Sequence, residues 1–259
     1  CIDTIESQNP GSYLIQMATG LGKTVTFANT KRKGKMLILS HREELVKQPL
    51  KYFDCPTGIE MAGSHASPVD QVVSASVMSM TRRTERFAPD EFDIIVTDEA
   101  HHAAAKSYRN IYEHFTPRLH LGFTATPNRS DNIRMDDIYE DIIFQRDLKW
   151  GIQNGYLSDI FCRRVNIGYD LSAVHARGGD YAPGELEQAI DGTADALAQD
   201  YRGGASGETM MFEVSVAQAG EMARRIPGQV AVTGETTNRA GIGTALTGGR
   251  IHSLSDMSA

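Results

Sequence analysis

Residues 13–24 read Tyr-Leu-Ile-Gln-Met-Ala-Thr-Gly-Leu-Gly-Lys-Thr, an apolar strand pattern followed by a glycine-containing turn. Glycines let backbone N–H groups close around phosphate oxygens at the start of a helix, because a Cβ atom would block that path. A lysine there supplies positive charge, and a threonine hydroxyl can ligate Mg²⁺. The strict pattern GxxxxGK[ST] is not met, since Met17 takes the first glycine position, and a plain turn with an exposed lysine is the alternative. The residues expected to bind a polyphosphate are Thr19, Gly20, Leu21, Gly22, Lys23 and Thr24.

A second signal lies at residues 93–101, Asp-Ile-Ile-Val-Thr-Asp-Glu-Ala-His, where an apolar strand ends in two acidic residues. Open α/β sheets bind ligands at the carboxyl ends of their strands, which is where these carboxylates would lie. We expect Asp98, together with Thr24, to hold Mg²⁺, and Glu99 to orient and deprotonate a water that attacks a γ-phosphate. A solvated acidic turn is the alternative, and the Gly-Lys-Thr turn upstream argues against it.

Short apolar runs alternate with helical patterns through the first half of the chain, which is typical of a parallel α/β sheet flanked by helices. Several runs are continuously apolar, as in strands that are buried on both faces. A helix over residues 42–48 is expected to stop at Pro49, and a second one, with Tyr108 and Ile111 on its apolar face, to end before Pro117. The expected strands are Tyr13–Gln16, Met36–Ser40, Gln71–Ala75, Asp93–Thr97 and His120–Phe123.

The pattern changes after about Leu157, where glycine-rich stretches separate shorter apolar runs. Glycines next to small polar residues favour loops and linkers. The segments expected here are a strand at 161–167, a glycine-rich loop at 177–180, a helix with Leu186, Ile190 and Leu197 on one side, a flexible linker at 202–207, a strand at 209–214, a helix with Val216, Ala219, Ala223 and Ile226 on one face, and a strand at 229–233. The last three segments form a strand–helix–strand unit, which predicts the opening of a second α/β domain.

Further motifs follow the first two in order, namely 38–48 (ILSHREELVKQ), 74–80 (SASVMSM), 122–127 (GFTATP), 210–216 (MMFEVSV) and 232–236 (VTGET) with Arg239 behind it. This series resembles the superfamily 2 DEAD/DEAH-box helicases, and Asp98-Glu99-Ala100-His101-His102 resembles the branch of the type III restriction-enzyme helicase subunits. The resemblance implies an α/β fold: a RecA-like P-loop NTPase parallel sheet flanked by helices, followed by part of a second RecA-like domain. It implies an ATP-binding domain at 1–160, a connecting segment at 161–205 and an incomplete second domain at 206–259.

The resemblance also assigns roles to residues of this chain. Lys23, Asp98, Glu99 and His101 would carry catalysis. Thr124 and Thr126 would hydrogen-bond towards His101, so that the state of the γ-phosphate is felt at the nucleic-acid face. His41, Arg42 and Ser76 would contact the nucleic-acid backbone, mostly without reading bases. An exposed helix start is the alternative for His41 and Arg42, and a simple turn before Pro127 is the alternative for the two threonines.

The chain departs from the resemblance at both ends. It begins with Cys1 rather than Met, and motifs V and VI do not appear before Ala259. We therefore expect a truncated chain that begins inside a longer protein, with the adenine-reading segment upstream of the phosphate loop missing or cut short. Since an arginine finger of the kind found in motif VI is worth about 10³–10⁵ in rate, we expect slow ATP hydrolysis.

The charge and cysteine content of the chain limit the kinds of partner that it can bind. The formal net charge is −7, so contact with nucleic acid must come from a local patch rather than from bulk positive charge. Arg82 and Arg83 are one candidate patch, with a solvated turn as the alternative. Cys1, Cys55 and Cys162 are widely spaced without a CxxC pair, which favours a reducing cytoplasm and argues against a zinc site. No apolar run approaches the roughly 18 residues of a membrane span.

These observations lead to one main hypothesis, an ATP-dependent helicase or translocase that uses ATP and Mg²⁺ and acts on DNA, with RNA as a possible substrate. A nuclease or modification subunit is a possible partner, and no membrane is expected. The alternative is a non-catalytic nucleic-acid-binding or regulatory module that keeps the fold; the intact Lys23, Asp98 and Glu99 argue against it. A metabolic P-loop kinase would leave the motifs at 98–101 and 124–126 without a role.

Overall fold

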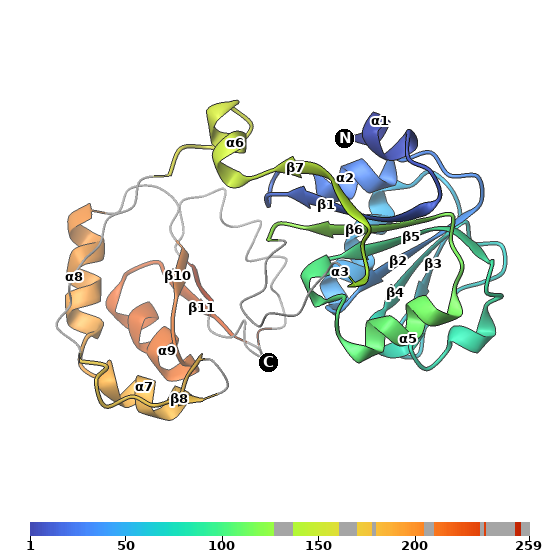
Figure 1. Ribbon diagram of the computed structural model, residues 1–259. Coiled ribbons are helices and arrows are strands. Elements are labelled where there is room, and N and C mark those ends of the chain that lie inside the picture. The colour runs from blue at the N-terminus through green and yellow to red at the C-terminus, as the bar shows by residue number, and fades with distance from the viewer. Residues whose placement is uncertain are drawn as a thin grey trace. The chain divides into compact units, whose positions relative to one another are not determined.

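A parallel β-sheet forms the centre of the first part of the chain in the computed structural model (Figure 1). The structure describes residues 1–126, 137–160, 170–177, 180–204, 210–233, 236 and 252–254. The chain divides into two compact units, Cys1–Ile160 and Phe161–Ala259, and each is treated separately below.

The sheet of the first unit has seven strands in the order β3-β4-β2-β5-β6-β1-β7, and all neighbours pair in parallel. The strands are β1 Gly11–Met17, β2 Lys35–Ser40, β3 Thr57–Glu60, β4 Val72–Ser76, β5 Phe92–Asp98, β6 Leu119–Thr124 and β7 Asp141–Arg146. The five strands expected from the sequence are confirmed within one or two residues. The sequence pattern did not reveal β3 and β7, the two edge strands. The α/β fold class of parallel strands with flanking helices is confirmed.

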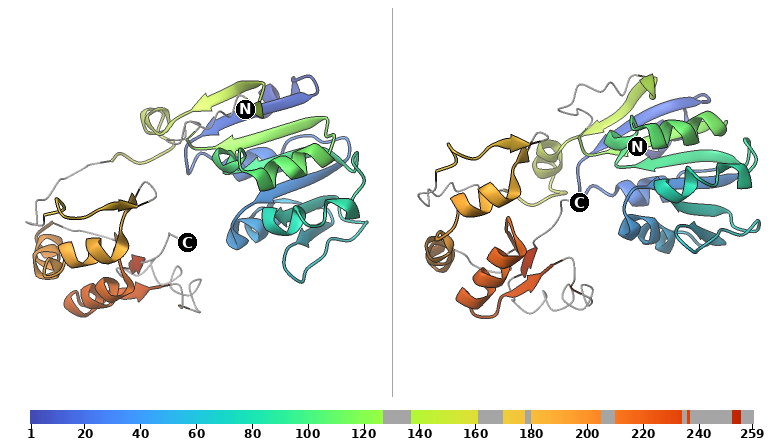
Figure 2. Two further views of the ribbon diagram at one scale, coloured as in Figure 1. Left: turned by 60° about the horizontal axis from the view of Figure 1, so that its bottom comes forward. Right: turned by 90° about the horizontal axis from the view of Figure 1, so that it is seen from below.

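Helices cover both faces of this sheet (Figure 2). The helices of the first unit are α1 Ile2–Glu6, α2 Lys23–Ala28, α3 Glu43–Lys47, α4 Val77–Met80, α5 Lys106–His114 and α6 Leu148–Gln153, with the 3₁₀ helices η1 Gln48–Tyr52, η2 Thr84–Arg86 and η3 Ala100–His102. Helix α3 ends before Pro49 as expected. The chain then continues directly into η1, because proline near a helix start does not remove a needed N–H donor.

Alternate side chains of the central strands enter two hydrophobic cores. Ile15, Ile38 and Phe123 belong to the core that also contains Phe27 of α2. Leu37 and Ile95 belong to the core on the α5 side, with Ile111 of that helix. Because both faces are covered, the strands must be apolar almost throughout, which explains their continuous apolar runs.

The second unit contains a three-stranded parallel sheet in the order β10-β12-β11 and a short antiparallel pair. Its elements are β8 Ala176–Arg177, β9 Asp180–Tyr181, α7 Pro183–Ala189, α8 Ala194–Gly204, β10 Met210–Phe212, α9 Val216–Arg225, β11 Val230–Val232 and β12 His252–Leu254. The expected strands at 209–214 and 229–233 and the helix between them are confirmed. The expected strand at 161–167 lies outside the described residues.

Two predictions for the second unit were wrong. The single helix expected to carry Leu186, Ile190 and Leu197 is two helices, because Gly192 between them adopts a left-handed φ of 80°. The first three residues of the linker expected at 202–207 are helical and complete α8. Ala198 of that helix packs in a core with Met222 of α9, and this tertiary contact outweighs the low helix propensity of the glycines.

Candidate nucleotide-binding site

The phosphate loop lies between β1 and α2, as the sequence predicted. Gly20 and Gly22 have φ angles of 89° and 84°, and Gly22 is the residue immediately before α2. A Cβ atom on Gly20 would lie 2.8 Å from Leu157 Cδ2, so glycine is required there both for its backbone angle and for space. Thr19 is exposed, and Thr24 in the first turn of α2 is partly buried. The loop therefore has the backbone path that a polyphosphate site needs.

Lys23 lies beside the acidic residues that follow β5. Its Nζ atom is 3.3 Å from Glu99 Oε1, and the other carboxylate oxygen, Oε2, is 3.3 Å from His101 Nδ1. The side chain of Lys23 is only 11% exposed and that of Glu99 is 28% exposed. These residues meet because β1 and β5 both flank β6 and run in the same direction, so their carboxyl ends share one edge of the sheet.

Glu99 has an unusual backbone. Its φ of 51° and ψ of 52° are left-handed, and Ala62 is the only other non-glycine residue with positive φ in the described part of the chain. Left-handed backbone is unfavourable for a side chain with a Cβ atom, and such strain is concentrated at functional sites. The turn at Glu99 places its carboxylate between Lys23 and His101.

Asp98 is buried, with 7% of its surface exposed. Burial raises the pKa of its carboxyl group, and the neighbouring Glu99 adds to the rise, while Lys23 and the backbone N–H of Glu99 oppose it. A nearby cation stabilises the ionised form of such a group, and Mg²⁺ prefers oxygen ligands and needs only one or two carboxylates. The carboxylate of Asp98 is therefore of the kind that a magnesium site uses, and its pairing with the hydroxyl of Thr24 at such a site stays a prediction.

Thr124 connects this group to the next strand. Its Oγ1 atom lies 3.3 Å from His101 Nδ1. The same hydroxyl donates to the carbonyl oxygen of Thr126 at 3.1 Å and accepts from the backbone N–H of Thr126 at 3.2 Å. Thr124 is fully buried, and the side chain of Thr126 is exposed. The side chain of Thr124 therefore contacts His101. Thr126 joins this group only through its backbone N–H and carbonyl groups, which bond to the Thr124 hydroxyl.

A row of three histidine rings runs from Glu99 to the loop after β2. The ring centroids of His101 and His102 are 4.1 Å apart, and those of His102 and His41 are 4.4 Å apart. Arg42 donates from Nε to His41 Nε2 at 3.2 Å. Burial lowers the pKa of His41, and the positive charges of Arg42 and His101 lower it further, while Glu99 opposes them. The sequence did not reveal the bridging position of His102, since no spacing rule relates residues 41 and 102.

Ser76 lies at the end of β4, where it pairs with Ser40, the residue before His41, and it directly precedes α4. Its hydroxyl accepts from the backbone N–H of Ser79 at 3.2 Å and lies 3.0 Å from the Ser79 hydroxyl, so it caps the helix. Only 7% of Ser76 is exposed. Its expected contact with nucleic acid stays a prediction.

Arg83 does not have the free guanidinium group that a DNA contact needs. It donates from Nη1 to Glu60 Oε1 at 2.6 Å, and Arg86 donates to Glu60 Oε2 at 2.7 Å. His65 Nδ1 lies 3.0 Å from the same carboxylate, which is fully buried. The buried carboxylate at the end of β3 therefore pairs with Arg83, which argues against Arg83 as a DNA contact, and that contact stays a prediction. Arg82 is exposed and remains a candidate.

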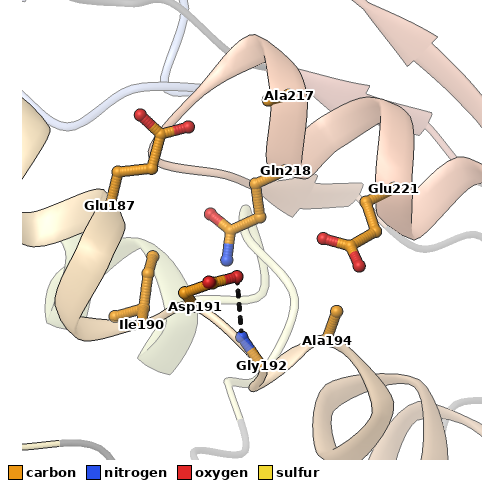
Figure 3. Close-up of a pocket in the computed structure, with 8 residues that line it drawn as sticks. All are labelled: Glu187, Ile190, Asp191, Gly192, Ala194, Ala217, Gln218 and Glu221. Carbon is orange, nitrogen blue, oxygen red and sulfur yellow. Dashed lines mark hydrogen bonds between the residues drawn. The ribbon is translucent and has the colours of Figure 1, made fainter.

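A separate pocket of about 110 Å³ lies in the second unit between α7, α8 and α9 (Figure 3). Its acidic residues are Glu187, Asp191 and Glu221. Glu187 accepts from the Ser215 hydroxyl, Asp191 accepts from the backbone N–H of Gly192, and Glu221 pairs with Arg225. Within the described ranges, no three His, Cys, Asp or Glu side chains are arranged to hold a metal ion. The polar groups of this pocket serve local structure.

The glycine-lined phosphate loop, the lysine facing an acidic strand end and the histidine joined to the next strand define a P-loop NTPase of the helicase type. Residues 1–129 match the family described as "Type III restriction enzyme, res subunit". The chain belongs to the superfamily 2 helicases, in the branch that resembles the type III restriction-enzyme subunits.

Two relatives support this assignment, and a solved structure shares the fold. The chain is 33% identical over 205 residues to "Putative ATP-dependent helicase IRC3" of Saccharomyces cerevisiae, covering 70% of this chain and 30% of that protein. It is 32% identical over 189 residues to the "Type I restriction enzyme EcoAI endonuclease subunit" of Escherichia coli, covering 65% and 23%. The Hef helicase domain of Pyrococcus furiosus has the same fold, with a TM-score of 0.60 at 14% identity over 98% of this chain and 84% of that one. The chain thus spans less than a third of the length of these two curated relatives.

Proposed function

We propose that this chain is the ATP-hydrolysing part of a nucleic-acid helicase or translocase that acts on DNA. The observation that carries the proposal is the position of the Glu99 carboxylate, 3.3 Å from both Lys23 Nζ and His101 Nδ1. These distances support a role for Glu99 as a base, with Lys23 binding phosphate on one side and His101, which contacts Thr124 of β6, on the other.

The triphosphate would lie in the loop at residues 19–24, with backbone N–H groups and Lys23 around its oxygens. Thr24 and Asp98 would hold Mg²⁺, which neutralises charge on the phosphates. Glu99 takes a proton from a water, whose oxygen forms a bond to the γ-phosphorus. The bond from that phosphorus to the β–γ bridging oxygen breaks, so that ADP and phosphate leave.

The hydrogen bond from His101 to Thr124 and the row of His41, His102 and His101 support coupling between hydrolysis and nucleic acid. A change at the γ-phosphate moves Glu99 and His101, and the ring contacts carry that change to His41 and Arg42. We assign 1–160 to an ATP-binding RecA-like domain, 161–205 to a connecting segment and 206–259 to the beginning of a second RecA-like domain.

DNA is the favoured nucleic acid because the family and one relative are restriction enzymes. The same likeness favours a nuclease or modification subunit as partner. Cys1 and Cys55 are free thiols, which favours a cytoplasmic location. No helix in the described segments is long and apolar enough to cross a bilayer.

The test is ATP hydrolysis by the chain with and without single-stranded DNA, double-stranded DNA or RNA. We expect stimulation by DNA and loss of activity in Lys23→Ala. Lys33→Ala is the matched control, because Lys33 is exposed and precedes β2 at the opposite edge of the sheet. Full activity of Lys23→Ala, or no stimulation by any nucleic acid, would contradict the proposal. Nucleic-acid binding without turnover would favour the non-catalytic module instead.

A further inference from the structure

Four side chains form a continuous stack at the end of β7 and along α6, and we call it the aromatic ladder: Phe144, Arg146, Trp150 and Tyr156. The Arg146 guanidinium carbon lies 4.8 Å from the ring centroids of both Phe144 and Trp150. Trp150 and Tyr156 are stacked, with centroids 5.3 Å apart and planes at 14°. Tyr156 ends the ladder and is 68% exposed.

The backbone around the ladder is fixed. Asp147 accepts from the backbone N–H of Trp150 at 2.7 Å and so caps α6. Gly155 turns the chain back with a φ of 72°, and the N–H of Tyr156 donates to the carbonyl oxygen of Gly151 at 2.9 Å. An exposed aromatic ring on a fixed backbone loses little conformational entropy when a ligand binds to it.

The aromatic ladder begins beside the phosphate loop. Strand β7 pairs with β1, and the N–H of Ala18 donates to the carbonyl oxygen of Arg146 at 2.9 Å. Leu157, the residue after Tyr156, fills the space at Gly20, where a Cβ atom would lie 2.8 Å from its Cδ2. Figure 1 shows α6 beyond the end of β7, with β7 next to β1.

The strand order indicates in which direction the base of a bound nucleotide would extend from its phosphates. Lys23 faces Glu99 on the β5 side of the phosphate loop, whereas β7 lies on the other side of β1. A nucleotide whose terminal phosphate lies at Glu99 would therefore extend its base away from β5, towards the aromatic ladder. Flat bases stack on aromatic side chains, and every base has a π-face for this contact.

We propose that the exposed ring of Tyr156, supported by Trp150 and Arg146, is the surface on which the purine base of the bound nucleotide stacks. The inference rests on the proposed function, because it takes the phosphate position from Lys23 and Glu99. It adds a base-binding site downstream of the phosphate loop. Because stacking tolerates different bases, ATP and GTP are expected to use it alike.

The chain provides a direct probe, since Trp150 is its only tryptophan. We expect ATP to quench or shift the Trp150 fluorescence, because the base would join the stack beside it. Tripolyphosphate carries the same phosphates without a base, and it is expected to bind without changing the fluorescence. An equal change with both ligands, or no change with ATP under saturation, would overturn the proposal.

Variants provide the second measurement, by calorimetric titration of the whole chain. Tyr156→Ala is expected to weaken ATP binding about 5- to 150-fold, the range given by stacking of one base, and to leave tripolyphosphate binding unchanged. Tyr156→Phe keeps the ring and is expected to restore ATP binding. Tyr52→Ala is the matched control, since Tyr52 is also an exposed tyrosine of the first unit and lies in η1.

Three outcomes would overturn the proposal: unchanged ATP affinity in Tyr156→Ala, an equal loss for ATP and tripolyphosphate, or loss of single-stranded DNA binding with ATP affinity intact. The last outcome would show that the aromatic ladder binds nucleic acid and not the base of the nucleotide. Failure of the proposed function is distinguishable from these, because it would appear as ATP and tripolyphosphate binding that survives Lys23→Ala.

Discussion

The left-handed backbone of Glu99 predicts an inverted order of stability for two inactive variants, Glu99→Gly and Glu99→Ala. Both substitutions remove the same carboxylate and therefore the same contacts with Lys23 and His101. They differ in the backbone, where alanine keeps a Cβ atom at a φ of 51° and glycine does not. The difference between the two variants therefore reports the strain at this position, reduced by the chain entropy that glycine adds to the unfolded state.

The magnitude follows from two opposing terms. A left-handed residue with a Cβ atom costs about 1–2 kcal/mol, while glycine in place of alanine in ordinary structure costs about 0.5–1 kcal/mol through chain entropy. The first term is larger, so we expect Glu99→Gly to be about 1 kcal/mol more stable than Glu99→Ala. In a domain of this size, that corresponds to a rise of about 2–4 °C in the melting temperature.

The assay is denaturant unfolding of the two variants side by side, with ATP hydrolysis measured to verify that both are inactive. Ala62→Gly is an independent control, because Ala62 has a φ of 48° and loses only its methyl group. That variant is expected to gain a similar free energy of unfolding. If Glu99→Ala were instead about 0.5–1 kcal/mol more stable than Glu99→Gly, only the chain entropy of glycine would be acting, the strain would be absent and the reasoning refuted.

Three further predictions concern charge and coupling. The folded-state pKa of Asp98 is raised, so its ionisation disfavours folding as the pH rises above the ordinary aspartate range. Asp98→Asn should therefore be more stable than the wild type at neutral pH. Unfolding curves recorded in acid should show no such difference between the two proteins. Burial alone would raise the pKa of Glu60, but its interactions with Ala66, Arg83, His65 and Arg86 lower it. The contribution of Glu60 to the free energy of unfolding is therefore present above the ordinary glutamate range and lost as the pH falls through the folded-state pKa. Glu60→Gln is expected to cost about 3 kcal/mol in denaturant unfolding at pH 7, and a loss under 1 kcal/mol would contradict this. His102→Ala is expected to reduce the stimulation of ATP hydrolysis by DNA about 10-fold, and unchanged stimulation would exclude the histidine row as the coupling path.

The central strands could be predicted because they are buried on both faces and so need continuous apolar runs. The two edge strands do not need continuous apolar runs. Strand β3 has only four residues, and β7 is exposed at Asp141 and Ile142. Edge strands therefore leave a weak signal in the sequence. The break at Gly192 was missed for another reason, since a glycine within a helical pattern does not reveal whether its φ is positive.

The site was predictable where it depends on short spacing. The phosphate loop and the acidic strand end each form within a few residues, so their chemistry is visible in the sequence. The ion pair of Arg83 was not predicted because its partner, Glu60, lies on β3, more than twenty residues earlier in the chain. The contact of His102 with His41 and the position of Tyr156 beside the phosphate loop depend in the same way on how distant segments pack.

The fold class, the phosphate loop and the acidic strand end could all be predicted from the amino-acid sequence, because hydrophobic periodicity and local turn chemistry act over a few neighbouring residues. Which of these groups meet depends on the tertiary structure. Parallel strands bring their carboxyl ends to one edge whatever their distance along the chain, and this places Lys23 against Glu99 and His101 against Thr124. Pairing of β7 with β1 likewise brings the aromatic ladder to the phosphate loop, a proximity that the order of residues does not contain.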